Sequence, residues 1–351
     1  MAKKHYIIPI FVPHKGCPFD CVFCNQKKIT GCEEEITKDQ VNQQIIDYMA
    51  TIQSAEDKHV EIAFFGGSFT GIEQKKQQEL LEIAYKWKTK GMVNDIRIST
   101  RPDYINEAIV EFLQKYGVSI VELGVQSMDK EVLKKSNRGH SPKDVIKAVE
   151  VLRKFNVKIG LQMMVGLPFD TLEKAEYTAK EIIKLKPNFV RIYPTLVIKG
   201  TYLEKMYEEG EYHPLSVEEA VHISKQLLLQ FTKHNIPVIR IGLQPTENIL
   251  LGREVVAGPF HSAFRQLVES KVFKEVLDDV FFIHKIRNIQ WVKLMVHEKN
   301  ISSIVGHKKE NIDFIKEKYK IQKISIVRNN DLKLNQLQIF YGENKVLYTK
   351  K

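Results

Sequence analysis

Three cysteines near the start of the chain have a spacing suited to an iron-sulfur cluster. Cys17, Cys21 and Cys24 follow the pattern C-x3-C-x2-C, and Cys32 comes shortly after them. Three thiolates on one short loop can bind three corners of a cubane 4Fe-4S cluster and leave one iron open to another ligand. A structural zinc site, with Cys32 or His14 as the fourth ligand, is an alternative, as is a ferredoxin-type cluster.

Composition indicates an ordinary globular protein with a sizeable core. The 351 residues are 43% hydrophobic and 27% charged, which excludes disordered, collagen-like and coiled-coil classes. The longest apolar runs fall far short of the roughly 18 to 20 residues that cross a membrane. We therefore expect a cytoplasmic protein with no membrane segment.

Strand-like and helix-like segments alternate along the first two thirds of the chain, and the strand candidates are nearly all apolar, as in parallel sheets that are buried on both faces. We expect strands at residues 6–12, 60–65, 95–99, 119–125, 158–165 and 189–198. Amphipathic helices are expected between them, at residues 38–52, 74–90, 105–116, 141–155 and 171–185. This order predicts an α/β protein with a partial (β/α)6 TIM-like barrel.

The informative residues follow the strand candidates, at the ends where such barrels carry their chemistry. The cysteine loop follows the first strand, Gly66-Gly67-Ser68 the second, and Thr100 the third. Gln126 follows the fourth strand, and a Gly-Leu-Pro turn at 166–168 follows the fifth.

Beyond the barrel, a helix at 217–234 and a short strand at 238–241 lead to a basic tail. Residues 283–351 carry 15 Lys and Arg against 6 Asp and Glu, a net charge of +9 out of +10 for the chain. We expect a barrel over 1–245, a linking helical segment over 246–282 and a small basic α+β domain over 283–351. Such a charge asymmetry suits a polyanion such as nucleic acid, although lysine-rich surfaces also serve solubility.

Five further segments carry a family resemblance. In order they are residues 99–104 (STRPDY), 122–127 (ELGVQS), 137–140 (NRGH), 162–164 (QMM) and 191–201 (RIYPTLVIKGT). With C-x3-C-x2-C and an aromatic residue before its last cysteine, they resemble the radical S-adenosylmethionine (SAM) superfamily. The similarity extends to the radical domain of the Elongator catalytic subunit, over about residues 8–245.

The resemblance implies roles for individual residues. Cys17, Cys21 and Cys24 would hold a 4Fe-4S cluster, and Phe23 would pack near the adenine of SAM. Gly66, Gly67 and Ser68 would meet the methionine end, with Thr100, Gln126, Arg138 and Gln162 around the rest of the cofactor. Tyr193 and Lys199 face the same end of the barrel and could touch the substrate.

Simpler roles are open for several of these residues. Gln126 and Gln162 could satisfy backbone groups, Arg138 could pair with a surface acid, and Lys199 could be solvated. We expect Cys32 to be a spectator. No acyl-coenzyme A signature of the Gln-x-x-Gly-x-Gly kind occurs in the chain, so acetyl transfer is not expected of it.

A loop in the tail resembles the Gly-x-x-Gly loop of KH domains, which clamps a nucleic-acid backbone. It begins at Gly306, and Lys309 replaces the second glycine. His307, Lys308 and Lys309 at a helix start suit phosphate. The alternative is a solvated lysine turn in a domain that only packs against the barrel.

These observations predict a radical SAM enzyme that modifies RNA, in particular tRNA at a wobble-type uridine, with flavodoxin or ferredoxin as electron donor. One alternative is a radical SAM enzyme for a porphyrinogen. The porphyrinogen family has a tyrosine and a fourth cysteine where this chain has Pro13 and Gln26. Another alternative is a non-catalytic nucleic-acid-binding protein with zinc or an iron-sulfur loop.

Overall fold

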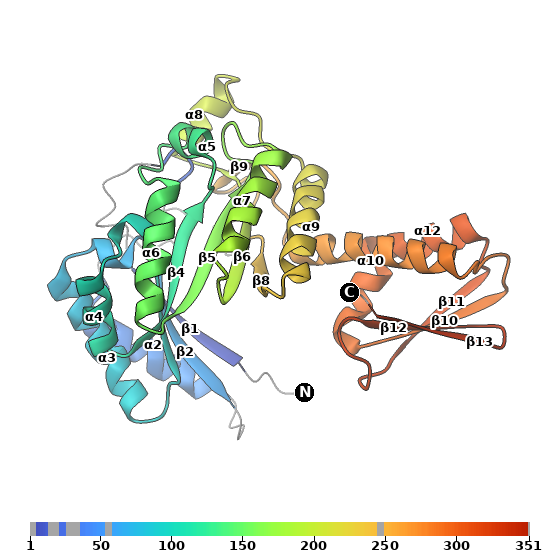
Figure 1. Cartoon of the computed structure of the whole chain (residues 1–351), viewed down its shortest axis with the longest axis horizontal. Helices are drawn as coiled ribbons and strands as arrows, with labels where there is room; N and C mark the ends of the chain where they lie inside the picture. The colour runs from blue at the N-terminus through green and yellow to red at the C-terminus, as the bar shows by residue number, and fades with distance from the viewer. Residues whose placement is uncertain (1–4, 13–20, 26–35, 53–57, 244–248, 350–351) are drawn as a thin grey trace. The chain divides into compact units, whose positions relative to one another are not determined.

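The chain divides into two compact units in the computed structural model (Figure 1). The structure describes residues 5–12, 21–25, 36–52, 58–243 and 249–349. The first unit comprises Met1–Ala220 and Gln230–Phe260, and the second comprises Val221–Leu229 and His261–Lys351.

The first unit is built on a seven-stranded sheet in which all neighbouring strands are parallel. The strand order is β1-β2-β3-β4-β5-β6-β8. The strands are β1 His5–Val12, β2 His59–Gly66, β3 Asp95–Thr100, β4 Val118–Gln126, β5 Lys158–Val165, β6 Phe189–Pro194 and β8 Val238–Ile241. Because all neighbouring strands are parallel, their carboxyl ends meet at one edge of the sheet.

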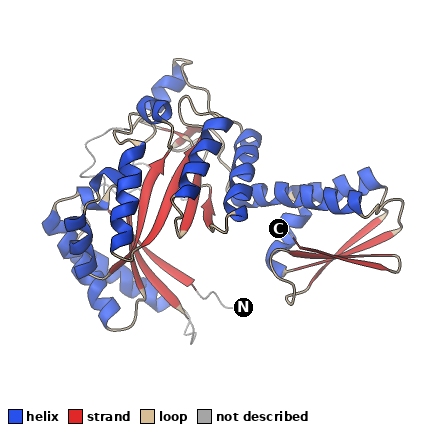
Figure 2. Ribbon diagram, in the orientation of Figure 1, coloured by secondary structure: helices blue, strands red, loops and turns tan. Residues whose placement is uncertain are grey.

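Helices follow most of these strands along the chain, and several of them run alongside the sheet (Figure 2). The helices of the first unit are α2 Lys38–Thr51, α3 Gln74–Thr89, α4 Glu107–Lys115, α5 Lys130–Lys135, α6 Pro142–Lys154, α7 Leu172–Lys184 and α8 Tyr202–Glu208; α9 Val217–Lys233 begins in it, but its residues Val221–Leu229 belong to the second unit. Several begin at capping residues: Thr37 with Gln40 and Ser216 with Glu219 form capping boxes, which satisfy the first free N–H groups of the helix. A small antiparallel pair, β7 Val197–Ile198 and β9 Val255–Ala257, lies beyond β6.

The second unit has its own hydrophobic core between helices and a four-stranded sheet. Its elements are α10 Phe264–Ile283, β10 Trp291–Val296, α11 Ile301–Val305, α12 Glu310–Tyr319, β11 Lys323–Arg328, β12 Gln336–Tyr341 and β13 Asn344–Thr349. The strand order is β11-β10-β12-β13. Val292, Leu294 and Ile339 of the sheet are fully buried with Leu277 of α10 and Ile315 of α12.

The predicted α/β partial barrel with a small α+β domain is confirmed. Residues 158–165 and 238–241 form strands with the predicted bounds, and the latter is the seventh strand of the sheet. The predicted strand 189–198 is interrupted after Pro194, so that residues 197 and 198 pair with β9 instead. The short helices α5, α8 and α11 and the last strand, β13, were not predicted. In the described part of the chain, no helix combines the length and apolar character needed to span a membrane.

Candidate active site

A pocket lies where the parallel strands end, and it gathers residues from six separate chain segments. The lining residues are Cys21, Phe23, Cys24, Gly66, Gly67, Ser68, Ser99, Thr100, Arg101, Gly124, Gln126, Arg138 and Gln162. Every cofactor-binding residue predicted from the sequence is among them. Ser99, Arg101 and Gly124 were not predicted as site residues. Cys17, the first cysteine of the pattern, lies outside the described residues, as do Cys32 and His14.

The second half of the cysteine loop is anchored by backbone hydrogen bonds. Cys24 N–H donates to the Cys21 carbonyl at 2.9 Å, which closes a tight turn. Val22 lies between them; its N–H donates to Ser136 and its carbonyl accepts from Leu203 N–H at 2.7 Å. Cys21 is buried, and it forms no disulfide with Cys24. Both cysteines of the turn line the pocket.

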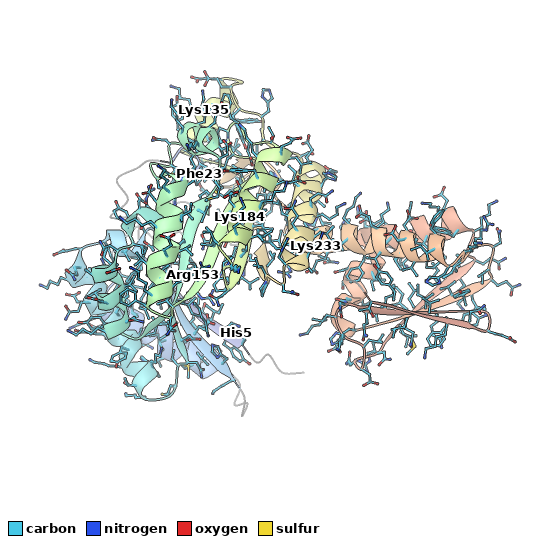
Figure 3. All side chains as sticks on the ribbon, in the orientation of Figure 1. His5, Phe23, Lys135, Arg153, Lys184 and Lys233 are labelled. Carbon is cyan, nitrogen blue, oxygen red and sulfur yellow. The ribbon has the colours of Figure 1, made fainter. Side chains whose placement is uncertain are left out.

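Phe23 lies on this turn and is labelled in Figure 3. It is partly buried and packs against a small apolar cluster that includes Val197, Leu203 and Met206. Phe23 thus lines the pocket and also attaches the loop to β7 and α8. Its predicted contact with adenine stays a prediction.

The Gly66-Gly67-Ser68 turn has no room for a side chain at its first position. Gly66 has a φ of +109°, and a Cβ there would lie 2.4 Å from the Val12 carbonyl oxygen. Gly67 N–H donates to the same oxygen at 3.3 Å. Glycine is therefore required because β1 and β2 approach each other closely at the edge of the pocket.

Ser68 and Thr100 connect the next two strand ends. Their hydroxyls are 2.8 Å apart, and Ser68 Oγ also accepts from Arg101 N–H at 3.2 Å. Thr70 Oγ1 is 2.5 Å from Thr100 Oγ1. The hydrogen bond between Ser68 and Thr100 therefore holds the loop after β2 against the end of β3.

Arg138 reaches the cysteine loop from beyond α5. Its Nη1 donates to Cys21 Sγ at 3.5 Å, and its Nη2 donates to the Gly124 carbonyl at 2.7 Å. Its buried Nε has no hydrogen-bond partner among the described residues. Arg101 Nη2 donates to the Arg138 carbonyl at 2.7 Å and pairs with Asp103. The Arg138 guanidinium therefore contacts both the cysteine loop and the end of the sheet.

Gln126, at the end of β4, has a strained backbone and an unsatisfied side chain. Its φ is +65°, a left-handed conformation that is uncommon outside glycine, asparagine and aspartate. Its buried Oε1 has no hydrogen-bond partner in the described part of the chain. Strain and an unpaired polar atom in one pocket residue are typical of a binding site, where a ligand supplies the missing contact.

Gln162 is held from below by a buried ionic network. Its Nε2 donates to Glu122 Oε2 at 2.7 Å. Arg191 approaches the same carboxylate, with Nε 2.8 Å from Oε2, and Arg97 pairs with both Glu122 and Glu61. Burial opposes ionisation of Glu122, but the two guanidinium groups outweigh it and hold the pKa below its usual range. This charged network fixes Gln162 at the floor of the pocket.

The pocket fits a thiolate-bound cluster with a polar organic ligand. Two cysteine sulfurs, an arginine with an unpaired Nε and an amide with an unpaired Oε1 share one space. The cysteine sulfurs can bind a metal cluster. The arginine Nε–H and the amide oxygen offer a donor and an acceptor to a charged cofactor such as SAM.

The predicted substrate residues do not line this pocket. Tyr193 is on β6, where Arg191 Nη1 donates to its hydroxyl at 3.4 Å, and burial raises the pKa of Tyr193. Lys199 is exposed in the β7–α8 turn. Its carbonyl accepts from Asn25 Nδ2 at 3.1 Å, so the turn contacts the residue after Cys24. Their roles toward a substrate stay predictions.

In the second unit, His307, Lys308 and Lys309 are exposed between α11 and α12. Gly306 has a φ of +82°, and Lys308 and Lys309 have φ values of +48° and +69°. The loop therefore keeps left-handed backbone at Lys309, where the KH pattern has its second glycine. Its contact with RNA stays a prediction.

A further cluster of possible metal ligands lies where β1 and β2 begin. His5, labelled in Figure 3, has its Nε2 2.8 Å from Glu61 Oε1, and His59 Nε2 lies 3.5 Å from the same oxygen. Arg97 already pairs with Glu61, and Lys158 lies 3.1 Å from the neighbouring Asp95. These cations neutralise the carboxylates, so we assign no metal to the cluster.

Comparison with protein families accounts for this arrangement. The model described as the Radical SAM superfamily matches residues 11–182, and that of the Radical_SAM C-terminal domain matches residues 187–274. A Methanocaldococcus jannaschii protein named uncharacterized protein MJ0486 is 33% identical over 236 residues, which cover 66% of this chain and 68% of that protein. The chain belongs to the radical SAM superfamily. Members of this superfamily bind a 4Fe-4S cluster and SAM, which confirms the predicted cofactors.

Within the radical SAM superfamily, the resemblance to Elongator is also confirmed. The tRNA uridine(34) acetyltransferase of Methanocaldococcus infernus is 34% identical over 198 residues, which cover 51% of this chain and 37% of that protein. Elongator complex protein 3 of Saccharomyces cerevisiae is 28% identical over 190 residues, 48% of this chain and 34% of that protein. The chain thus spans only about a third of the length of these two relatives.

A solved structure of the same kind shares the fold. Archaeal Methanocaldococcus infernus Elp3 with an N-terminal deletion superposes with a TM-score of 0.62 at 24% identity. The match covers 79% of this chain and 64% of that chain. It confirms the radical SAM half-barrel.

Proposed function

We propose that this protein is a radical SAM enzyme that modifies tRNA, at a wobble-type uridine. The observation that carries the radical chemistry is the meeting of Cys21 and Cys24 with Gly66, Gln126 and Arg138 in one pocket. Tight binding of a cofactor there would satisfy the polar atoms that the protein alone leaves unpaired.

Some residues of the pocket would hold the cluster, and others would hold SAM. We propose that Cys17, Cys21 and Cys24 hold the cluster, and that Arg138 orients the loop through Cys21 Sγ and the Gly124 carbonyl. Gly66 and Gly67 let the backbone of the β2 turn approach the amino-acid end of SAM, and Gln126 and Gln162 supply amide groups to the rest. Cluster and SAM, when bound, supply a 5′-deoxyadenosyl radical and methionine after one electron enters from a flavodoxin or ferredoxin.

Two independent observations support tRNA as the substrate. Relatives with the same radical domain are named tRNA uridine(34) acetyltransferases. The segment 283–351 has a net charge of +9, and phosphate neutralisation by Lys and Arg dominates nucleic-acid binding. We also propose that His307, Lys308 and Lys309 contact the RNA backbone, and that the enzyme works in the cytoplasm.

The experiment is reduction-dependent formation of 5′-deoxyadenosine by anaerobically reconstituted protein, with and without total tRNA. Cys21→Ser is the control that removes a cluster ligand. We expect turnover that tRNA stimulates and that the variant loses. Turnover that ignores tRNA would reject the RNA substrate and reopen a small molecule such as a porphyrinogen, whereas bound zinc without turnover would reject the enzyme.

A further inference from the structure

The sheet of the second unit has one face that its helices do not cover. Helices α10 and α12 lie on one side of the sheet (Figure 1), and Val292, Leu294 and Ile339 point to them as part of the core. Strand residues alternate between faces, so the residues between these positions point the other way. Trp291 is 44% exposed and Leu347 is 52% exposed on that side. We call it the open face.

Aromatic and basic side chains alternate across the open face. Lys293 of β10 is paired with Phe340 of β12, and Phe340 is paired with Lys345 of β13. The two ammonium groups lie 5.3 and 5.5 Å from the centroid of the Phe340 ring. On the other side, Trp291 is paired with Lys323 of β11. Trp291 and Phe340 are thus diagonal neighbours, about 7 to 8 Å apart in such a ladder.

The charge of the strands is of one sign. The four strands contain Lys293, Lys323, Arg328 and Lys345 and no Asp or Glu. An apolar protein partner would gain little from three lysines on its binding face, because each would lose hydration without an acid to pair with. A single-stranded nucleic acid suits both kinds of side chain, because its bases stack on aromatic rings and its phosphates attract ammonium groups.

We infer that the open face is a stacking platform for a single-stranded segment of the RNA substrate. Bases would stack on Trp291 and Phe340. Lys293 and Lys345 would turn from the Phe340 ring to the flanking phosphates, and Lys323, beside Trp291, would contact a further phosphate. This inference rests on the proposed function for the choice of RNA. It adds a surface distinct from the Gly306–Lys309 loop, which lies between α11 and α12 and not on the sheet.

Trp291 itself provides the readout. The chain has two tryptophans, and the other, Trp87, is in the first unit with its Nε1 donating to Asn42 Oδ1 at 3.0 Å. Trp87→Phe in the full-length protein leaves Trp291 as the single tryptophan, whose emission can be excited selectively over that of tyrosine. Titration with a twelve-nucleotide oligouridylate should quench its fluorescence, because a base stacked on the indole changes its surroundings. Absence of quenching at concentrations that saturate binding by anisotropy would overturn the platform.

Substitutions on the face separate stacking from charge. Phe340→Leu should weaken oligonucleotide binding about 5- to 100-fold, the cost of losing one stacked base, whereas Phe340→Tyr should retain it. Lys293→Gln with Lys345→Gln should weaken binding and make it less salt-dependent, by about 1.4 in the slope of log K against log salt for two lost phosphate contacts. Lys271→Gln with Lys320→Gln changes charge equally elsewhere in this unit and should leave binding nearly unchanged.

The other possible outcomes of these experiments distinguish failure of the platform from failure of the proposed function. Equal losses in the two lysine pairs would show nonspecific attraction and overturn the platform, as would full binding by Phe340→Leu. Concentration-dependent dimerisation that Trp291→Ala abolishes, without RNA binding, would assign the face to a second copy. If tRNA stimulates 5′-deoxyadenosine formation equally in wild type and Phe340→Leu, the platform fails and the proposed function stands. If the oligonucleotide quenches Trp291 but tRNA gives no stimulation, the proposed function fails.

Discussion

Arg138 joins the cysteine loop to the end of β4: its Nη1 donates to Cys21 Sγ and its Nη2 to the Gly124 carbonyl. Gly124 leaves room for this contact, because a Cβ there would lie 2.9 Å from Arg138 Nη2. One guanidinium thus fixes the distance between a predicted cluster ligand and a strand end of the pocket.

We expect Arg138→Lys to lower the rate of 5′-deoxyadenosine formation by about 10- to 100-fold, since a single ammonium cannot make both contacts of the fork. The measurement is the initial rate with saturating SAM in the reconstituted enzyme. Lys134→Gln, on exposed α5, is the control and should keep the wild-type rate. A wild-type rate in Arg138→Lys would show that the fork is dispensable.

Gly66→Ala should destabilise the metal-free protein by about 2 to 4 kcal/mol, because the new methyl would overlap the Val12 carbonyl oxygen and the backbone is left-handed. Gly91→Ala is a matched control, with a φ of +72° but no atom within 4 Å of its Cβ. It should cost only about 1 to 2 kcal/mol, from the backbone alone. Urea unfolding of both variants measures the difference, and equal losses would contradict the steric cause.

Gln126→Gly should bind SAM at least about tenfold more weakly while the metal-free protein keeps or gains stability. Glycine relieves the left-handed strain and removes a buried Oε1 that lacks a partner, which together offset its greater freedom in the unfolded chain. Equilibrium dialysis gives the affinity and thermal unfolding gives the stability. Lower stability with unchanged SAM affinity would make Gln126 a structural residue.

His140 should make stability depend on pH. Burial, with Arg138 and Arg101 nearby, lowers the pKa of His140 to about 3, whereas the unfolded chain takes up a proton near 6.5. Its contribution is therefore complete above pH 6.5 and is lost as the pH falls from there toward 3, by at most about 1.4 kcal/mol per pH unit.

Urea unfolding of the metal-free protein between pH 4 and 8 tests this, with His140→Gln as the comparison. The variant is needed because burial raises the pKa of Asp170 to about 6, so the contribution of Asp170 is lost as the pH rises through the same range. The difference between wild type and variant should shrink as the pH falls. A difference that is constant with pH would mean that folding does not lower the pKa of His140.

Two sets of changes in the loop at Gly306 test its charge and its backbone conformation separately. Lys308→Glu with Lys309→Glu should weaken tRNA binding, by repulsion of phosphate, in filter binding at moderate salt. Lys309→Gly should leave stability unchanged or raise it by up to about 1 kcal/mol, because glycine adopts the left-handed backbone without strain. Unchanged retention of tRNA by the double glutamate variant would exclude the loop as an RNA contact.

The sequence by itself determined the strands and the edge at which chemistry is found. Apolar runs such as Lys158–Val165 can only be satisfied inside a parallel sheet, and parallel strands bring their carboxyl ends together. That is why Gly66, Thr100 and Gln126 could be expected at one edge of the sheet from their positions after successive strands. Gln162 lies within β5, and its place was implied by the family resemblance. The signal for Gly124 was present in the same way, since a glycine two residues before Gln126 makes room for a neighbour.

Only the tertiary structure decided which side chains meet across long sequence distances. The contact of Asn25 with Lys199, the pairing of Gln162 with Glu122 and the reach of Arg138 to Cys21 depend on loop paths that no local pattern encodes. The same holds for the open face: β13 has an apolar run of only three residues, 346–348, and it pairs with the edge that Gln336–Tyr341 leaves free. Local sequence sets which backbone forms, whereas the packing of distant segments sets which atoms are left to bind.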